Sequence, residues 1–221
     1  MSKVIITLVG STCSGKTTLK DQLLASGKYI EVISHTTRPM RTGEVDGETY
    51  HYVTQEQFDD MEMLERISYN GNTYGGSVQE FEKGFDSGLI PVIIVEPNGN
   101  KQINMNAREK GWIVVNVWIG CPVELQAERL ITRLLADHVA ASYMSDDPTD
   151  NKLIKEYSSR LVMIQTVENE WPKLFAESTL HDTTNSGRAP VVISIPVFTK
   201  DNELDIRGRV EVIAELYADQ G

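Results

Sequence analysis

A glycine-rich motif near the start of the chain constrains its fold more than any other feature. Residues 9–18 read V-G-S-T-C-S-G-K-T-T and contain the complete pattern G-x-x-x-x-G-K-[ST]. The apolar run Val4–Val9 predicts a buried parallel strand before the motif, and a helical pattern, Lys16–Ser26, follows it. Such a strand–loop–helix unit is a phosphate-binding loop, in which backbone N–H groups and a helix N-terminus surround phosphate. The sequence therefore predicts binding of a nucleoside triphosphate.

The residues of this loop have distinct expected tasks. Lys16 is expected to reach the β- and γ-phosphates and to act in catalysis, and the Thr17 hydroxyl is expected to ligate Mg²⁺. Cys13 is interpreted as a structural residue, because the sequence marks no base beside it. The expected ATP-binding residues are Gly10, Ser11, Thr12, Cys13, Ser14, Gly15, Lys16, Thr17 and Thr18.

Composition narrows the class of protein. A chain of 221 residues with 40% hydrophobic and 24% charged residues suits a single α/β domain that carries inserted subdomains. Its net charge of −11 argues against nucleic-acid binding, although a locally basic cleft could still hold a nucleotide. The sequence shows two cysteines, no signal peptide and no membrane span, so we expect a cytoplasmic protein that is a monomer or a homodimer. The four histidines do not have a metal-ligand spacing.

Apolar runs alternate with helical patterns, which predicts an α/β fold with a mostly parallel sheet and helices on both faces. The expected strands are Val4–Val9, Tyr29–Ser34, Leu89–Glu96, Ile113–Ile119 and Val191–Val197. The expected helices are Lys16–Ser26, Lys101–Lys110, Val123–Ala136, Lys152–Phe175 and Glu203–Ala218.

Two insertions interrupt this alternation. Between Ser34 and Leu89, short strands with antiparallel pairing are expected, and capping patterns at Thr54 and Ser77 predict two helix starts. A polar stretch, Asp137–Asn151, forms the second insertion. We therefore divide the single domain 1–221 into a core (1–33, 88–128 and 159–221), a first insertion (34–87) and a lid at about 129–158. Mobile insertions suit an enzyme that excludes water before phosphoryl transfer.

Residues 34–52 read S-H-T-T-R-P-M-R-T-G-E-V-D-G-E-T-Y-H-Y. This segment closely resembles the monophosphate-binding stretch of guanylate kinases, S-x-T-T-R-x-x-R-x-G-E-x-x-G-x-x-Y-x-F. The similarity continues through Glu65 and N-G-N-T-Y-G at 70–75, is weaker at R-L-x-x-R (129–133), and covers about residues 4–165. It implies a P-loop kinase core with an inserted NMP-binding subdomain and a lid. The implied reaction is phosphoryl transfer from ATP to a nucleoside monophosphate, foremost GMP or dGMP, with Mg²⁺.

The resemblance also implies roles for individual residues. Arg38 and Arg41 are planar and permanently charged, so they suit a phosphate monoester, and Tyr50 and Tyr74 would add hydroxyl donors. Glu65 and Ser34 would read the base. The expected NMP-binding residues are Ser34, Arg38, Arg41, Tyr50, Glu65, Tyr74, Ser77 and Glu96.

Phosphoryl transfer needs alignment and positive charge around the equatorial oxygens more than it needs covalent help. The expected catalytic residues are Lys16, Arg41, Arg133 and Arg160. Arg129 is interpreted as a surface salt-bridge partner of Glu124 or Glu128.

Two departures from the family pattern concern the base. Gly76 stands where the family usually has Ser or Thr, with Ser77 one residue later, and Ile94-Val95-Glu96 replaces a strand ending in D-x-D. Glu96 is therefore left open between a site residue near Mg²⁺ or the ribose and a residue that ends a strand. The alternative function is a kinase, including a virus-encoded one, for another purine or a modified deoxynucleotide. A non-catalytic guanylate-kinase-like binding module is disfavoured, because Lys16 and Thr17 are intact.

Overall fold

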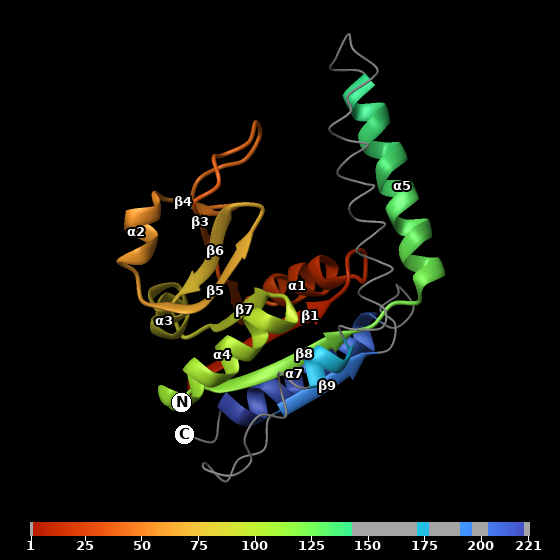
Figure 1. The fold of residues 1–221 in the computed structure, drawn as a ribbon. Helices are drawn as coiled ribbons and strands as arrows, with labels where there is room; N and C mark the ends of the chain where they lie inside the picture. Colours follow the sequence, from red (N-terminus) through yellow and green to blue (C-terminus); the bar gives the residue numbers. More distant parts are fainter. Residues whose placement is uncertain (1, 143–171, 177–190, 196–202, 219–221) are drawn as a thin grey trace.

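The computed structural model describes residues 2–142, 172–176, 191–195 and 203–218 (Figure 1). At its centre is a five-stranded parallel sheet with the strand order β2-β7-β1-β8-β9. All seven residues of the central strand β1 are buried, which accounts for its mostly apolar sequence. The strands of this core sheet are β1 (Val4–Gly10), β2 (Tyr29–Glu31), β7 (Ile90–Ile94), β8 (Ile113–Ile119) and β9 (Val191–Ile195).

Helices cover both faces of the core sheet, as the sequence predicts. Leu8 on one face of β1 belongs to an apolar cluster with Leu19 of α1 (Lys16–Ala25) and Val210 of α7 (Glu203–Ala218). Val9 points to the other face, where its cluster includes Phe81 of α3 (Val78–Asp86) and Ile103 of α4 (Pro97–Glu109). Because neighbouring strand residues face opposite ways, one strand anchors both layers. Helix α4 begins four residues before the predicted start, since proline is accepted in the first helical turn.

The first insertion forms a separate four-stranded sheet with the order β4-β3-β6-β5. Its strands are β3 (His35–Thr36), β4 (His51–Tyr52), β5 (Met63–Tyr69) and β6 (Asn72–Ser77). Strand β6 pairs antiparallel with β3 and β5 as expected, whereas β3 and β4 are parallel. The short helix α2 (Gln55–Asp59) starts at the predicted capping box of Thr54 and Gln57. The predicted strand Tyr29–Ser34 ends early, at Glu31, because the chain then crosses into this second sheet.

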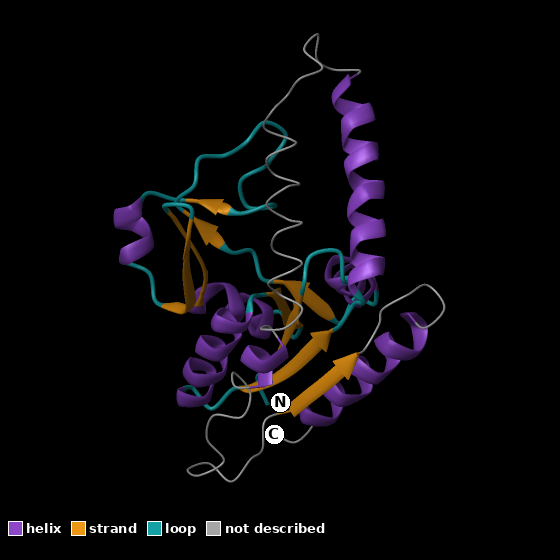
Figure 2. Ribbon diagram, turned by 45° about the vertical axis from the view of Figure 1, so that its right-hand side comes forward, coloured by secondary structure: helices purple, strands orange, loops and turns teal. Residues whose placement is uncertain are grey.

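A long helix, α5 (Val123–Ser142), and the second sheet project from the same side of the core sheet (Figures 1 and 2). The helix continues six residues past the predicted end at Ala136, and no glycine or proline interrupts it. The proposed boundary between core and lid, at residues 128 and 129, therefore falls inside one continuous helix. The rest of the expected lid (143–158), Arg160, and most of the predicted helix Lys152–Phe175 lie outside the described residues. None of the helices that the structure describes is long and apolar enough to cross a membrane.

Candidate active site

A cavity of about 640 Å³ lies between the carboxyl ends of β1 and β7 and the second sheet. Crevices at the carboxyl ends of parallel strands are the usual ligand sites of such sheets. The cavity brings together residues that the sequence analysis drew from distant segments. The core sheet and its loop contribute Gly10, Thr12, Lys16 and Glu96, and the first insertion contributes Ser34, Arg38, Arg41, Tyr50, Glu65 and Tyr74.

The phosphate-binding loop is tightly built. A side chain at Gly10 would come within 2.4 Å of the Ile119 carbonyl oxygen, so glycine is required there. Gly15, which precedes α1, has the left-handed φ of 102°. The Lys16 ammonium donates hydrogen bonds to the Gly10 carbonyl at 2.8 Å and the Ser11 carbonyl at 2.6 Å. Burial lowers the pKa of Lys16 from 10.5 to about 8, so at neutral pH it stays positively charged inside the loop.

One arginine of α5 contacts this loop, and a second lies within electrostatic range of it. The Arg129 guanidinium donates a hydrogen bond to the Cys13 carbonyl oxygen at 3.0 Å and contacts the Cys121 sulfur at 3.7 Å. Arg129 is therefore more than a surface residue of α5, because its side chain lies against the loop. The expected ion pair with Glu124 or Glu128 stays a prediction. The charge of Arg133 lowers the pKa of Lys16 further, which places Arg133 within electrostatic range of the donor side of the cavity.

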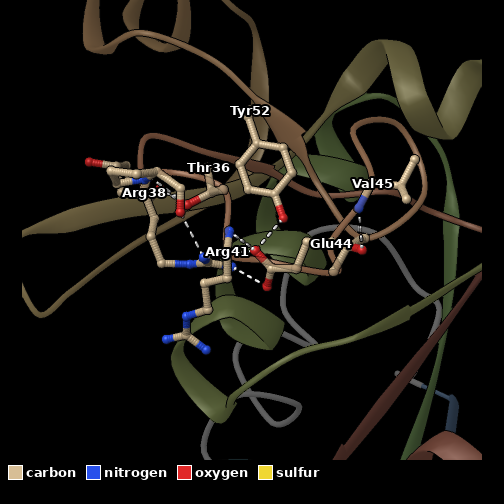
Figure 3. Close-up of polar contacts among 9 residues, drawn as sticks. Thr36, Arg38, Arg41, Glu44, Val45 and Tyr52 are labelled. Carbon is tan, nitrogen blue, oxygen red and sulfur yellow. Dashed lines mark hydrogen bonds and ion pairs between the residues drawn. The ribbon is translucent and has the colours of Figure 1, made fainter. Parts of the chain in front are cut away.

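The two arginines between β3 and β4, Arg38 and Arg41, have different environments (Figure 3). The Arg38 guanidinium donates two hydrogen bonds to the Glu44 carboxylate, at 2.9 and 2.8 Å. Glu44 also accepts from the Arg41 backbone N–H at 2.7 Å and from the Tyr52 hydroxyl at 2.8 Å. The Arg38 fork holds the pKa of Glu44 down, at about 2, and Glu44 raises that of Arg38.

In contrast, the Arg41 guanidinium extends away from Glu44 and has no hydrogen bond or ion pair among the described residues (Figure 3). It also lines the cavity. The structure therefore separates an arginine that braces the loop, Arg38, from one that is available to an anion, Arg41.

Glu65 is buried in the wall of the cavity, 4% exposed. Its Oε1 atom accepts a hydrogen bond from the Gly76 backbone N–H at 2.8 Å. Its Oε2 atom is buried and has no hydrogen-bond partner among the described residues. Burial raises the pKa of Glu65 from 4.5 to about 7, and the nearby charge of Glu96 adds to the rise. An unpartnered buried carboxylate oxygen is a site for a ligand that donates hydrogen bonds.

The remaining predicted acceptor residues divide into two groups. Ser34 and the tyrosines Tyr50 and Tyr74 line the cavity, and the two tyrosine rings meet edge to face with centroids 5.9 Å apart. Ser77 is not among the lining residues. It is buried, 3% exposed, and its hydroxyl accepts a hydrogen bond from the Glu80 backbone N–H as the cap of α3.

The oxygen donors near the loop fit a magnesium ion. The Thr17 side chain is exposed in the first turn of α1, and Glu96 lies across the cavity close enough for Lys16 to lower its pKa, which burial raises. Hydroxyl and carboxylate oxygens are the ligands that Mg²⁺ takes alongside phosphate oxygens. Among the described residues, no group of three or more His, Cys, Asp or Glu side chains is arranged to hold a metal by itself.

A family model described as guanylate kinase matches residues 1–166 of the chain. The chain belongs to the guanylate kinase family. The guanylate kinase of Aliivibrio fischeri is 32% identical over 167 residues, which cover 71% of this chain and 79% of that protein. The guanylate kinase of Pseudomonas fluorescens is 40% identical over 95 residues, which cover 41% of this chain and 46% of the relative, so that match spans less than half of the relative.

A solved structure agrees on the fold. The crystal structure of guanylate kinase from Anaplasma phagocytophilum matches with a TM-score of 0.53 at 19% identity, covering 99% of this chain and 87% of that one. The α/β architecture built around the phosphate-binding loop is therefore that of the guanylate kinase family.

Sequence reasoning missed three residues of this candidate site. Glu44 and Tyr52 stand within the segment that carries the resemblance, but only the fold shows that Glu44 binds Arg38 and that the Tyr52 hydroxyl donates to Glu44. Arg129 contacts the loop across 116 positions of sequence. The one available signal was that Glu44 is the acid in R-x-x-R-x-G-E, between residues already assigned to the site.

Proposed function

We propose that this chain transfers the γ-phosphoryl group of ATP to GMP or dGMP, forming ADP and the corresponding diphosphate. One observation carries the proposal: a single cavity joins Lys16 of the phosphate-binding loop to Arg41, Tyr50 and Glu65 of the first insertion. A donor site and an acceptor site that face each other are what in-line phosphoryl transfer requires.

On the donor side, the loop backbone and the first turn of α1 would bind the phosphates of ATP. Lys16, already drawn into the loop by two carbonyl oxygens, would neutralise the β- and γ-phosphates. Arg129 would hold the loop in shape through the Cys13 carbonyl. Thr17 and Glu96 would hold the Mg²⁺ of the nucleotide, which supplies charge neutralisation to the phosphate oxygens.

On the acceptor side, the free fork of Arg41 and the hydroxyls of Tyr50 and Tyr74 would bind the phosphate of the monophosphate. The Arg38–Glu44 pair would keep the backbone of this loop in place. The acceptor oxygen is already anionic, so this scheme requires no general base. Arg133, and Arg160 from the family resemblance, would add positive charge around the transferred group.

At the base, Glu65 would accept hydrogen bonds from the N1–H and 2-amino groups of guanine, using the Oε2 atom that has no described partner. The wall beside it is apolar, from Ile67, Ile94 and Val95. Recognition would therefore rest on the 2-amino edge of the purine. We expect other purines with a 2-amino group to be the best secondary substrates.

An acceptor panel tests this proposal. ADP release is measured with GMP, dGMP, AMP, CMP, UMP and a 2,6-diaminopurine monophosphate at fixed ATP. The proposal expects GMP and dGMP to react fastest and the diaminopurine nucleotide to follow them. A pyrimidine nucleotide as the best acceptor would overturn the assignment of Glu65, and no acceptor-dependent release with any nucleotide would overturn the kinase activity. We place the reaction in the cytoplasm, because the two free cysteines suit a reducing compartment.

A further inference from the structure

Helix α4 carries a stripe of polar side chains that binds the outer edge of strand β5. Gln102, Asn106 and Lys110 are spaced four residues apart, so they share one face of the helix. Strand β5 is the last strand of the second sheet, and β6 pairs with only one of its edges. An unpaired strand edge presents backbone N–H and C=O groups that need partners.

The contacts made by this stripe imitate strand pairing. The Gln102 side chain accepts a hydrogen bond from the Arg66 backbone N–H and donates one to the Arg66 carbonyl, both at 3.0 Å. The Asn106 amide donates to the Leu64 carbonyl at 2.8 Å. Beyond them, Lys110 pairs with Glu62 at 2.6 Å. The two amides therefore bind the backbone on both sides of Glu65.

The opposite side of α4 is fixed to the core. Ile103 and Ala107 are fully buried in the cluster that covers the core sheet. Asn104 exchanges hydrogen bonds with Asn116 of β8, at 2.7 and 3.1 Å. The helix contacts both β8 and β5 (Figure 1). It is therefore a direct mechanical link from the core sheet to the strand that carries Glu65.

The helix also passes close to the Glu65 carboxylate. A side chain at Gly99 would lie 3.3 Å from the Glu65 Oε2 atom and 3.1 Å from the Ile67 side chain. The first turn of α4 thus limits where that oxygen can lie, and the amides of the next turns hold the backbone behind it.

We propose that Gln102 and Asn106 are positioning residues of the acceptor site, which fix the β5 backbone and so aim Glu65 into the cavity. This inference rests on the proposed function, since it assigns Glu65 to the base. Its consequence is that recognition of the base depends on two side-chain amides, those of Gln102 and Asn106, that contact neither substrate. Loss of the Gln102 amide should weaken binding of the monophosphate and leave ATP binding unchanged.

The test compares Gln102→Met, which keeps the length of the side chain and removes both hydrogen bonds, with Gln102→Glu, which keeps the acceptor for the Arg66 N–H. Lys101→Met, an exposed neighbour on the same helix, is the matched control. Two lost hydrogen bonds predict a roughly tenfold rise in KM for GMP with Gln102→Met, and a smaller rise with Gln102→Glu. KM for ATP should not change in any of the three variants.

Amide hydrogen exchange supplies a readout that is independent of catalysis. The Arg66 N–H should be protected in the wild type and should exchange faster in Gln102→Met, without a general loss of protection in β1 or β8. Unchanged KM for GMP in a folded Gln102→Met variant would overturn the inference, and so would equal rises in both Michaelis constants. If Gln102→Met does not fold, Gln102→Glu is used instead: a rise in KM for GMP without a rise in KM for ATP supports the inference, and unchanged constants overturn it. A wild type without GMP-dependent activity would instead refute the proposed function.

Discussion

Replacing Glu65 with glutamine should make the ligand-free protein more stable while removing its ability to use guanine nucleotides. Glu65 is 4% exposed, one of its oxygens has no described partner, and burial raises its pKa from 4.5 to about 7. A rise of this size corresponds to about 3 kcal/mol of differential stability between the protonated and ionised forms. The ionised carboxylate is therefore a destabilising group that the acceptor site retains.

The sign of the pH dependence follows from proton linkage. Between pH 4.5 and about 7, the folded protein holds a proton on Glu65 that the unfolded chain releases, so the contribution of Glu65 to stability falls as the pH rises. Above pH 7 the ionised Glu65 carboxylate destabilises the folded protein by the full amount, and below pH 4.5 this destabilisation is absent. The free energy of unfolding of Glu65→Gln should therefore exceed that of the wild type by near zero at pH 4.5 and by as much as about 3 kcal/mol at pH 8.

Urea unfolding of the wild type and Glu65→Gln at several pH values from 4.5 to 8 measures this difference. Glu109→Gln, at an exposed position of α4, is the control for the loss of one carboxylate. In parallel, kcat/KM for GMP should fall below pH 7 in the wild type, and in Glu65→Gln it should be lower by about a hundredfold or more at pH 8. A stability difference that does not vary with pH, or a variant less stable than the wild type at pH 8, would refute the reasoning.

Three further substitutions test other parts of the site. Lys16→Ala should lower kcat by about a hundredfold or more with an unchanged circular dichroism spectrum, and a residual rate above about a tenth of the wild type would contradict the role of Lys16. Arg41→Met should raise KM for GMP much more than KM for ATP in steady-state assays and should also lower kcat; a change in the ATP constant alone would show that Arg41 is misassigned. Arg129→Met should raise KM for ATP and leave KM for GMP unchanged, because Arg129 contacts the loop at Cys13, and the reverse pattern would exclude this role.

Several strands, loops and helix starts could be predicted because neighbouring residues determine them. The apolar run at Val4–Val9, the glycines of the loop and the helix after Lys16 are confirmed within a residue at each end. Strand β8 has the predicted bounds, and the Thr54 cap forms as its capping pattern predicts. In each case the signal lies within about ten consecutive residues, so tertiary contacts do not have to be known.

The parts that the sequence did not predict depend on contacts between distant residues. The end of β2 at Glu31 is set by the passage of the chain into the second sheet, and the parallel pairing of β3 with β4 places His35 beside His51. Gln102 meets Arg66 across 36 positions. Residue type alone indicates that an amide can bind a strand edge, but not which strand edge it will reach.

In the candidate site too, some features could be predicted from neighbouring residues and others depend on the folded structure. The resemblance identified Arg38 and Arg41 as a pair. It could not show that the Arg38 guanidinium is hydrogen-bonded to Glu44 while that of Arg41 is available to a ligand. Ser77 was expected both to bind the monophosphate and to start a helix; the structure confirms the cap of α3, and Ser77 does not line the cavity. The local pattern predicts the Ser77 cap, whereas the pairing of Arg38 with Glu44 depends on the fold of the loop.

The most direct test of the account is the stoichiometry of product formation. The purified chain is incubated with ATP, Mg²⁺ and GMP, and ADP and GDP are separated and quantified over time, with Lys16→Ala as the control. The account predicts that ADP and GDP form in equal amounts, that both depend on GMP, and that both are lost in the control. ADP formation without GDP, or neither product from a protein that binds both nucleotides, would contradict it.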